Sequence, residues 1–465
     1  MVWLLTLAGC ILGPKPEACS ANSDCRSAFG FGYTCGEEGY CAAPAVSDRC
    51  ADTFPEDLLT RPEKYKNAVV VGTIYSKEFD TVQRQSTELA IRQYLSDGNN
   101  DAYPIAVIHC DTDEDVAYAD DLTVEQAAGE VTRMFQQLEV PAIVGPSTSD
   151  EAFASFDAIN GGAAVVVSPS ATSPELSTVE DTPAEGSPGV FWRTVPPDDL
   201  QTFAIAEDMK LRSVDSVFIV YEDNSYARPL ATGVADLVGA EGIATDLVIY
   251  DALENFQLSS VPTDAEVFFV TSSSAEVGDF LDLLGASPAF QGTVFLADAA
   301  ADPALFSVSP AARSLFPVIR GTRPQVLTED YGPYLDFAGN YSSLYPEGPP
   351  VDSNVYASYS YDAGWMVLFG IEWARANGPI TGSTISEGLL HIASGDPVGM
   401  NATGLQDARA AFASGADIDA FGASGQLDFV DGEVNNPIEV WVIDEANEAF
   451  VVDLVCEPGG SCQSE

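Results

Sequence analysis

Apolar runs and helix-patterned segments alternate along most of the chain. The first apolar run, Val69–Tyr75, is rich in β-branched residues and predicts a buried strand, and the next segment, Glu78–Ser96, has helical periodicity. The same succession returns about every 35 residues, which is typical of a parallel sheet covered by helices on both faces. Further elements are predicted as strands at Ile105–His109, Ala142–Val144 and Ala163–Val167, and as helices at Val116–Leu138 and from Asp150.

A loop rich in Pro, Gly and Glu, Thr178–Gly189, interrupts this rhythm, and a second series of the same kind follows it. The second series predicts helices at Leu200–Leu211, Tyr226–Val238 and Ala275–Leu284, and strands at Ser216–Tyr221, Thr245–Ile249, Glu266–Thr271 and Thr293–Ala297. After Arg320 the pattern predicts helices at Asp330–Leu344, Asn354–Ala376, Ser383–Ala393 and Leu405–Ala413, then short strands at Leu427–Phe429, Ile438–Ile443 and Phe450–Val455. We therefore expect an α/β protein with two doubly wound parallel-sheet lobes.

The composition of the chain excludes several classes of partner. Its 465 residues include 71 Asp and Glu against 19 Lys and Arg, a formal net charge of −52. This charge repels nucleic-acid phosphates and anionic membrane surfaces, so we exclude both as electrostatic partners. With 46% hydrophobic residues, the chain can still bury a large core. We interpret the charge as a solvated acidic surface, and attraction of cationic ligands is the alternative.

The sequence contains no familiar catalytic or cofactor motif. GxSxG, HExxH, GxxxxGK[ST] and GxGxxG do not occur in it. The loop Asp111–Asp115 begins like a calcium loop, but Val116 stands where an EF-hand needs Gly, and Leu122 stands where it needs Glu. We therefore expect neither enzymatic activity nor a cofactor nor a bound metal.

The amino terminus has the pattern of an export signal. An apolar run, Met1–Leu5, leads through Thr6 into Leu7-Ala8-Gly9-Cys10, which resembles a bacterial lipobox. This resemblance implies that residues 1–10 form a lipoprotein signal ending at a lipidated Cys10. The protein would then be held on the periplasmic or cell-surface side of a membrane through the lipid anchor alone. We expect no other segment to span a membrane, because the most apolar helix pattern, Tyr356–Ala374, contains Asp362 and Glu372.

The other eight cysteines fit an oxidising compartment. Cys19, Cys25, Cys35 and Cys41 lie among Gly, Asn, Ser and Pro and lack the CxxC pairs of a zinc site, so we expect a knot in which they are disulfide-bonded with one another. The knot and a linker would occupy residues 11–66. We expect Cys50 to bond Cys110, because the strands beside them would be neighbours, and Cys456 to bond Cys462 in a tail at 456–465. The spacing leaves the connectivity open.

Five segments of the body carry a family resemblance. They are Ala142–Ser149 with a Gly-Pro-Ser-Thr-Ser turn, Val167–Leu176, Phe191–Thr194, Phe218–Pro229 with Asp223-Asn224-Ser225-Tyr226, and Ala357–Gly370 with Tyr361-Asp362-Ala363. Together they make residues 67–455 similar to the periplasmic leucine/isoleucine/valine-binding protein family. The resemblance implies the type I periplasmic-binding-protein fold, in which two lobes joined by three crossovers close on a ligand.

The resemblance also implies where the lobes begin and end. Lobe 1 would comprise residues 67–194 and 323–424, and lobe 2 would comprise residues 195–320 and 427–455. The three hinges would lie near Arg193–Pro197, Ile319–Arg323 and Gly422–Gln426.

Two Ser/Thr-rich turns are the candidate ligand site. Ser147–Ser149 and Ser168–Ser173 each follow a strand and precede a helix, where free N–H groups and hydroxyls suit an anionic head group such as a carboxylate. The alternative is that both turns are simple helix caps.

The resemblance assigns individual residues to this site. It implies that Ser149, Ser170 and Thr172 hold the ligand carboxylate, that Tyr226 closes over the ligand from lobe 2, and that Asp298 is the acidic residue used by amino-acid binders. The first loop, Tyr75–Thr81, lacks the Gly-rich stretch of the family. The ligand therefore stays open between a branched-chain amino acid, another amino acid, a peptide, an amide and another small polar molecule.

These observations favour a solute-binding lipoprotein that delivers a small molecule to the permease of an ABC transporter. A ligand-sensing receptor module of the same fold, with the knot contacting a membrane partner, is the second hypothesis. An enzyme or a scaffold that has lost ligand binding is the third, and no nucleophile–base pair supports it.

Overall fold

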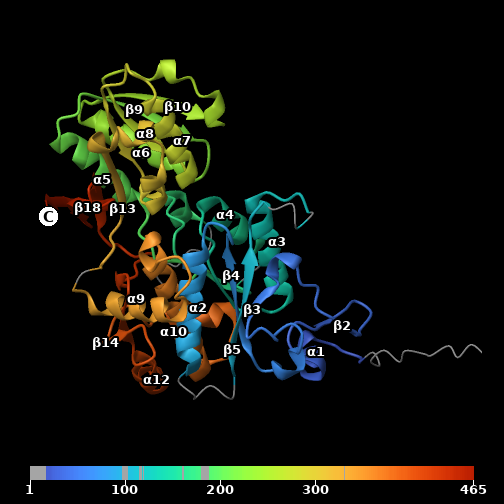
Figure 1. Ribbon diagram of the computed structural model, residues 1–465. Helices are drawn as coiled ribbons and strands as arrows, with labels where there is room; N and C mark the ends of the chain where they lie inside the picture. Colours follow the sequence, from blue (N-terminus) through green and yellow to red (C-terminus); the bar gives the residue numbers. More distant parts are fainter. Residues whose placement is uncertain are drawn as a thin grey trace, which may run out of the picture.

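The computed structural model describes residues 17–96, 103–114, 118, 120–159, 162–179, 188–328 and 330–464. Cys10 and the expected signal lie outside these residues, as does most of the predicted loop Thr178–Gly189. Figure 1 shows two lobes, one above the other, with a small blue module beside the lower lobe. No helix in the described ranges is both long enough and apolar enough to cross a membrane.

Lobe 1, the lower lobe in Figure 1, is built on a six-stranded sheet whose strands are parallel except for β3 at one edge. Its strands, in spatial order, are β3 (Asp52–Phe54), β5 (Ile105–Asp111), β4 (Val69–Tyr75), β6 (Ala142–Val144), β7 (Val165–Ser168) and β8 (Phe191–Arg193). Its helices are α2 (Thr81–Ser96), α3 (Val124–Gln137), α4 (Ser149–Ala158), α9 (Gly332–Leu344), α10 (Ala357–Asn377), α11 (Gly382–Leu389) and α12 (Gly404–Ser414).

The central strand β4 explains why helices cover both faces of this sheet. Every residue of β4 is buried. Val69 and Val71 point into a core formed with α2 and α10, whereas Val70 and Ile74 point into a second core formed with α3. A strand that is apolar on both faces needs a helix layer on each, as the apolar run predicts.

The start of α3 differs from the sequence expectation. We predicted a helix from Val116, but α3 begins at Val124. Thr123 accepts a hydrogen bond from the Gln126 N–H, and the Gln126 side chain accepts one from the Thr123 N–H. This capping box satisfies the free amides of the first turn and so fixes where the helix starts.

Lobe 2 is built on an eight-stranded sheet with a parallel half and an antiparallel half. Its strands, in spatial order, are β10 (Ala244–Tyr250), β9 (Ser216–Glu222), β11 (Glu266–Val270), β12 (Thr293–Leu296), β13 (Ile319–Pro324), β17 (Ile438–Asp444), β18 (Ala449–Glu457) and β19 (Ser461–Ser464). Helices α5 (Asp198–Leu211), α6 (Ala227–Ala240), α7 (Ser274–Gly285) and α8 (Pro310–Arg313) complete the lobe. The expected tail is thus part of the sheet, and Cys456 bonds Cys462 across β18 and β19.

The return of the chain from lobe 1 to lobe 2 lies later than predicted. The prediction of a strand at Leu427–Phe429 is wrong, because these three residues form a loop. Leu427 and, after it, Val434 are still buried in the core of lobe 1. The chain joins the sheet of lobe 2 only at Ile438. The strands present before this point form a separate small sheet of β14 (Asp396–Gly399), β15 (Ile418–Gly422) and β16 (Gly425–Gln426).

A buried carboxylate holds the hairpin between β15 and β16. Asp362 on α10 accepts hydrogen bonds from the N–H of Ala423 (2.8 Å) and of Ser424 (2.7 Å) and from the Ser424 hydroxyl (2.6 Å). A Cβ at Gly422 would stand 2.2 Å from the Asp362 carboxylate. The hairpin therefore approaches α10 this closely only because residue 422 is Gly.

The Cys-rich module, residues 17–66, docks on lobe 1. Its core of α1 (Asn22–Phe29), β1 (Thr34–Cys35) and β2 (Cys41–Ala42) is held by disulfides Cys19–Cys35 and Cys25–Cys41. Phe31 of the module is fully buried in a core of lobe 1. The sulfur atoms of Cys19, Cys25 and Cys35 lie close together, but each is already bonded in a disulfide.

The predicted bond between Cys50 and Cys110 is present, but its setting differs from our expectation. We placed Cys50 before the first parallel strand of the sheet. In the structure it precedes β3, an antiparallel edge strand that pairs with β5. The linker thus contributes a strand to the sheet of lobe 1.

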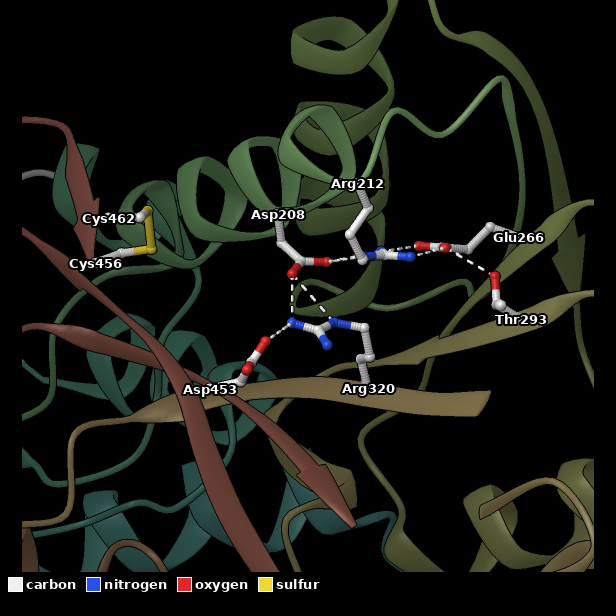
Figure 2. Close-up of polar contacts among 8 residues, drawn as sticks. All are labelled: Asp208, Arg212, Glu266, Thr293, Arg320, Asp453, Cys456 and Cys462. Atoms are coloured by element: carbon white, nitrogen blue, oxygen red, sulfur yellow. Dashed lines mark hydrogen bonds and ion pairs between the residues drawn. A yellow bond between two sulfur atoms is a disulfide. The ribbon is translucent and has the colours of Figure 1, made fainter. Parts of the chain in front are cut away.

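A network of ion pairs ties α5 to the sheet of lobe 2 (Figure 2). Asp208 is fully buried and accepts hydrogen bonds from Arg212 (Nε, 2.7 Å) and Arg320 (Nη2, 2.7 Å). Arg212 also makes a bidentate pair with Glu266 (2.6 and 2.7 Å), and Arg320 pairs with Asp453 on β18. The network therefore joins the helix that starts lobe 2 to strands from three separate parts of the chain.

Candidate functional site

The turn between β6 and α4 forms the first part of the candidate site. Thr148 caps α4 by accepting a hydrogen bond from the Glu151 N–H (3.3 Å), and Glu151 accepts one from the Thr148 N–H (3.0 Å). Ser149 is the first helical residue, and its Oγ accepts a hydrogen bond from the Ser173 N–H (3.2 Å). The Ser149 side chain thus links the two predicted Ser/Thr-rich turns. The capping alternative holds for both turns, because Ser173 also caps the short helix Pro174–Thr178 by accepting a hydrogen bond from the Glu175 N–H (3.3 Å).

The second turn follows β7 and brings Ser170 and Thr172 to the same place. The Ser170 hydroxyl lies 2.9 Å from the carbonyl oxygen of Ser147 and 3.0 Å from Gln83 Oε1. The carbonyl of Thr172 accepts a hydrogen bond from the Asp198 N–H (2.9 Å), where α5 of lobe 2 begins. Ser149, Ser170 and Thr172 are all buried, so the structure brings them together where lobe 1 meets lobe 2.

Asp298 is the centre of the contacts made by lobe 2. It follows β12 and is 4% exposed. Its Oδ1 accepts hydrogen bonds from the Tyr226 hydroxyl and from Gln201 Nε2 (2.9 Å), and its Oδ2 accepts one from the Tyr356 hydroxyl. Burial, together with the charge of Asp298, raises the pKa of Tyr226 and of Tyr356 well above the usual range, so both phenols stay protonated donors.

Tyr356 and Gln201 are site residues that the sequence did not reveal. Tyr356 precedes the first turn of α10 in lobe 1, so its bond to Asp298 joins the two lobes. Asp150 makes a second such contact, because its Oδ1 accepts a hydrogen bond from the Ser225 N–H (3.2 Å) of lobe 2.

Asp198 places a second buried carboxylate beside Asp298. It lies at the start of α5 and is 1% exposed. Its Oδ1 accepts a hydrogen bond from Gln201 Nε2 (3.2 Å), but its Oδ2 accepts none with good geometry from any described residue. Burial raises the pKa of Asp198 well above its usual range and the charge of Asp298 raises it further, whereas Thr172 and Arg193 oppose the shift.

More carboxylates line the lobe 1 side. The Ser147 hydroxyl donates to Asp80, whose pKa burial raises to about 6, while burial raises the pKa of Glu151 to about 7. The nearby Arg193 is fully buried, but it already pairs with Glu433 and donates to the carbonyl of Ser173 (2.8 Å). The region between the lobes is therefore rich in carboxylates.

Comparison with known proteins agrees with this architecture. Residues 82–281, less than half of the chain, match the family model described as receptor family ligand binding region. A leucine-binding protein from Thermotoga maritima has a similar structure, with a TM-score of 0.64 and 16% identity over 84% of this chain and 99% of its own. The chain has the type I periplasmic-binding-protein fold. The resemblance to the leucine/isoleucine/valine-binding family is thus confirmed at the level of the fold.

Other proteins of this fold differ in the ligand they hold. A branched-chain amino acid binding protein from Streptococcus pneumoniae, solved with isoleucine, has a TM-score of 0.59 and 16% identity over 84% of this chain and 100% of its own. A solute-binding protein from R. palustris, solved with benzoate, has a TM-score of 0.60 and 14% identity over 86% of this chain and 98% of its own. No curated protein sequence matches the chain significantly.

Proposed function

We propose that the protein is an extracytoplasmic solute-binding protein that captures an amino acid or a similar small polar ligand between its lobes. A lipid on Cys10 would anchor it, and it would deliver the ligand to the permease of an ABC transporter. The observation that carries this proposal is the pair of carboxylates, Asp198 and Asp298, buried where the lobes meet.

The charge of this region favours a ligand with a positively charged amino group. Burial raises the pKa of Asp198, and the charge of Asp298 raises it further, so two ionised carboxylates at this place are unfavourable together. An ammonium group between Asp198 and Asp298 would offset both charges and supply the donor that Asp198 Oδ2 lacks. Tyr226 would cover the ligand from lobe 2.

The lobe 1 turns would contact the rest of the ligand. Ser149 offers its hydroxyl and backbone at the start of α4, and Ser170 and Thr172 offer theirs in the turn after β7. A carboxylate alone would meet Asp80 and Glu151 nearby, so an amino group must accompany it. This proposal narrows the expected ligand from any polar molecule to one that carries an amine.

A thermal-shift screen tests the proposal directly. The purified chain is heated with amino acids, with amines lacking a carboxylate, and with carboxylates lacking an amine. A true ligand at 100 times its dissociation constant adds about 2.7 kcal/mol to the free energy of unfolding. Stabilisation by carboxylates alone would contradict the role given to the amino group.

A pair of matched variants locates the site. Asp298→Asn removes a charge at the proposed site and should weaken binding of the amine-bearing hit about tenfold or more. Asp246→Asn removes an equal charge from an exposed residue on the edge strand β10 of the same lobe and should leave the affinity unchanged. Equal affinities of the two variants would place the ligand elsewhere.

A ligand-sensing receptor module is the second candidate. Two observations favour it: the matched family model describes a receptor ligand-binding region, and the Cys-rich module adds a disulfide-held surface to lobe 1. Cross-linking of the ligand-bound protein in cells separates the two candidates, because a permease would be captured in the first case and a signalling protein in the second.

A further inference from the structure

A cavity of about 420 Å³ lies where the Cys-rich module meets lobe 1. Three of its ten lining residues are cations: Arg26 from the module, Lys66 from the linker and Arg375 from α10. Neither Asp nor Glu lines it. In a chain with 71 acidic residues and 19 Lys and Arg, this is an unusual concentration of positive charge.

The cavity is separate from the candidate ligand site. It is lined by Val69, the first residue of β4, and by Gly378, which directly follows α10. The candidate site lies at the carboxyl ends of the lobe 1 strands, so the two places are at opposite edges of one sheet. In Figure 1 the β4 and β5 arrows point toward lobe 2, and the module lies near their other ends.

Two of the cations donate to carbonyl oxygens rather than to carboxylates. Arg26 donates to the carbonyls of Lys66 (Nε, 3.1 Å) and Ala68, and Lys66 Nζ donates to the carbonyl of Ser27 (2.7 Å). Within the described residues neither is in an ion pair, whereas most of the described Arg and Lys side chains are. Carbonyl oxygens satisfy hydrogen bonds but do not neutralise the charges.

The third cation, Arg375, adds positive charge that is already partly balanced. It pairs with Glu372 (2.8 Å) and donates to the Tyr94 hydroxyl (2.6 Å). Burial lowers the pKa of Arg26, which reflects the cost of holding that charge away from water, and the charge of Glu139 only partly opposes this shift. An anion in the cavity would offset these charges.

We propose that this cavity binds a phosphate group. Arginine and lysine together are the side chains that proteins use most for phosphate, because they combine charge with several donors. The cavity volume lies within the roughly 300–1,000 Å³ of small-molecule sites, so it has room for a phosphate ester as well as for the free ion. The group comes from a soluble phosphate or from a lipid head group. The exclusion of anionic membrane surfaces drawn from the net charge concerns attraction by the whole surface, whereas this site acts by local contact. The site is independent of the function proposed above.

Calorimetry with inorganic phosphate tests the site, in the full chain with Cys10→Ser so that no acyl chain is present. A salt concentration of 0.15 M limits repulsion from the distant acidic surface, since screening then acts within about 8 Å. Lys66→Gln should weaken phosphate binding about tenfold. Lys77→Gln, an equal change at an exposed lysine outside the cavity, should leave it unchanged.

Flotation with vesicles distinguishes the two sources. Vesicles containing phosphatidylglycerol and vesicles of phosphatidylcholine alone are compared for the parent, Lys66→Gln and Lys77→Gln. Binding of free phosphate without flotation identifies a soluble ligand, and flotation that Lys66→Gln abolishes identifies a lipid head group. The proposal is overturned if neither probe binds, or if Lys66→Gln and Lys77→Gln bind both probes equally.

Discussion

At the scale of single residues, Asp298 makes one of the contacts that join the two lobes. Its carboxylate accepts hydrogen bonds from Tyr226 and Gln201 of lobe 2 and from Tyr356 of lobe 1. Each of these donors is neutral and each bond is charge-assisted, so their loss should cost more than the loss of an ordinary neutral bond. The contact also has to break for the lobes to separate.

The variant Tyr356→Phe measures how much the hydrogen bond from Tyr356 to Asp298 contributes to stability. Removal of the hydroxyl should lower the free energy of unfolding by about 1.5–3 kcal/mol, because a bond to a charged group is lost. Tyr359→Phe is the matched control on the same helix, since its hydroxyl donates to the carbonyl of Gln325 (2.8 Å), and it should cost about 1 kcal/mol. Denaturant titration gives both values. Equal costs would mean that Tyr356 adds nothing through the charge of Asp298.

The candidate residues could be predicted from the sequence only where local patterns mark them. Ser149 and Ser170 lie in turns that follow a strand, and such turns are recognisable in the sequence. Tyr356 lies 58 residues from Asp298, and nothing local to either residue signals that they meet. In the sequence, Asp198 is one more acidic residue in the first turn of a helix. Such residues are common because they stabilise the helix, so the position alone does not indicate a site.

At the scale of elements, the ion network of Figure 2 joins α5 to β11, β13 and β18. Asp208 is its buried centre, and it balances both Arg212 and Arg320. Because β13 carries the chain back toward lobe 1, the network fixes α5 and this crossover strand in one rigid unit. Any movement of one lobe relative to the other would therefore have to occur in the segments outside the network.

Asp208→Asn should destabilise lobe 2 by about 3 kcal/mol, because removal of one member of a buried ion pair leaves the partner charges uncompensated. The exposed pair of Arg228 and Asp223 provides the control, and Asp223→Asn should cost less than about 1 kcal/mol. Urea titrations of the two variants measure both costs. A cost for Asp208→Asn as small as for Asp223→Asn would show that the network contributes nothing to stability.

Elements were predictable where one physical signal dominates. The continuous β-branched run of β4 could only be a buried strand, whereas the helix expected from Val116 starts eight residues later, where Thr123 and Gln126 form a capping box. The short apolar run at Leu427 has the composition of a strand but packs as a loop on the core of lobe 1. Runs of three residues carry too little pattern to distinguish these outcomes.

At the scale of the whole molecule, the acidic composition and the buried carboxylates act in the same direction. Burial raises the pKa of Asp80 to about 6 and the pKa of both Glu151 and Asp362 to about 7. In the unfolded chain these groups titrate near pH 4, so between pH 4 and 7 the folded protein binds more protons than the unfolded one. Its free energy of unfolding must therefore fall as the pH rises through this range.

We expect the protein to be more stable near pH 5 than at pH 8, by several kcal/mol in total, since each of the three groups contributes on the order of 3 kcal/mol. Glu88 does not oppose this trend. Its interactions with His109 and Arg92 hold its pKa at about 2, below the ordinary value, so the stability it adds is lost only below about pH 4.5. Thermal unfolding across the pH series measures the slope.

A second pH series, measured at 1 M salt, separates the effect of the buried carboxylates on stability from that of the overall charge of −52. Repulsion among surface carboxylates also weakens as the pH falls, but at 1 M salt it is screened beyond about 3 Å, whereas buried groups are screened much less. The slope should therefore persist at 1 M salt in the parent and become shallower in Glu151→Gln, which cannot ionise at that position. If high salt removes the slope from the parent, surface repulsion alone is its cause, and the buried carboxylates do not link folding to pH.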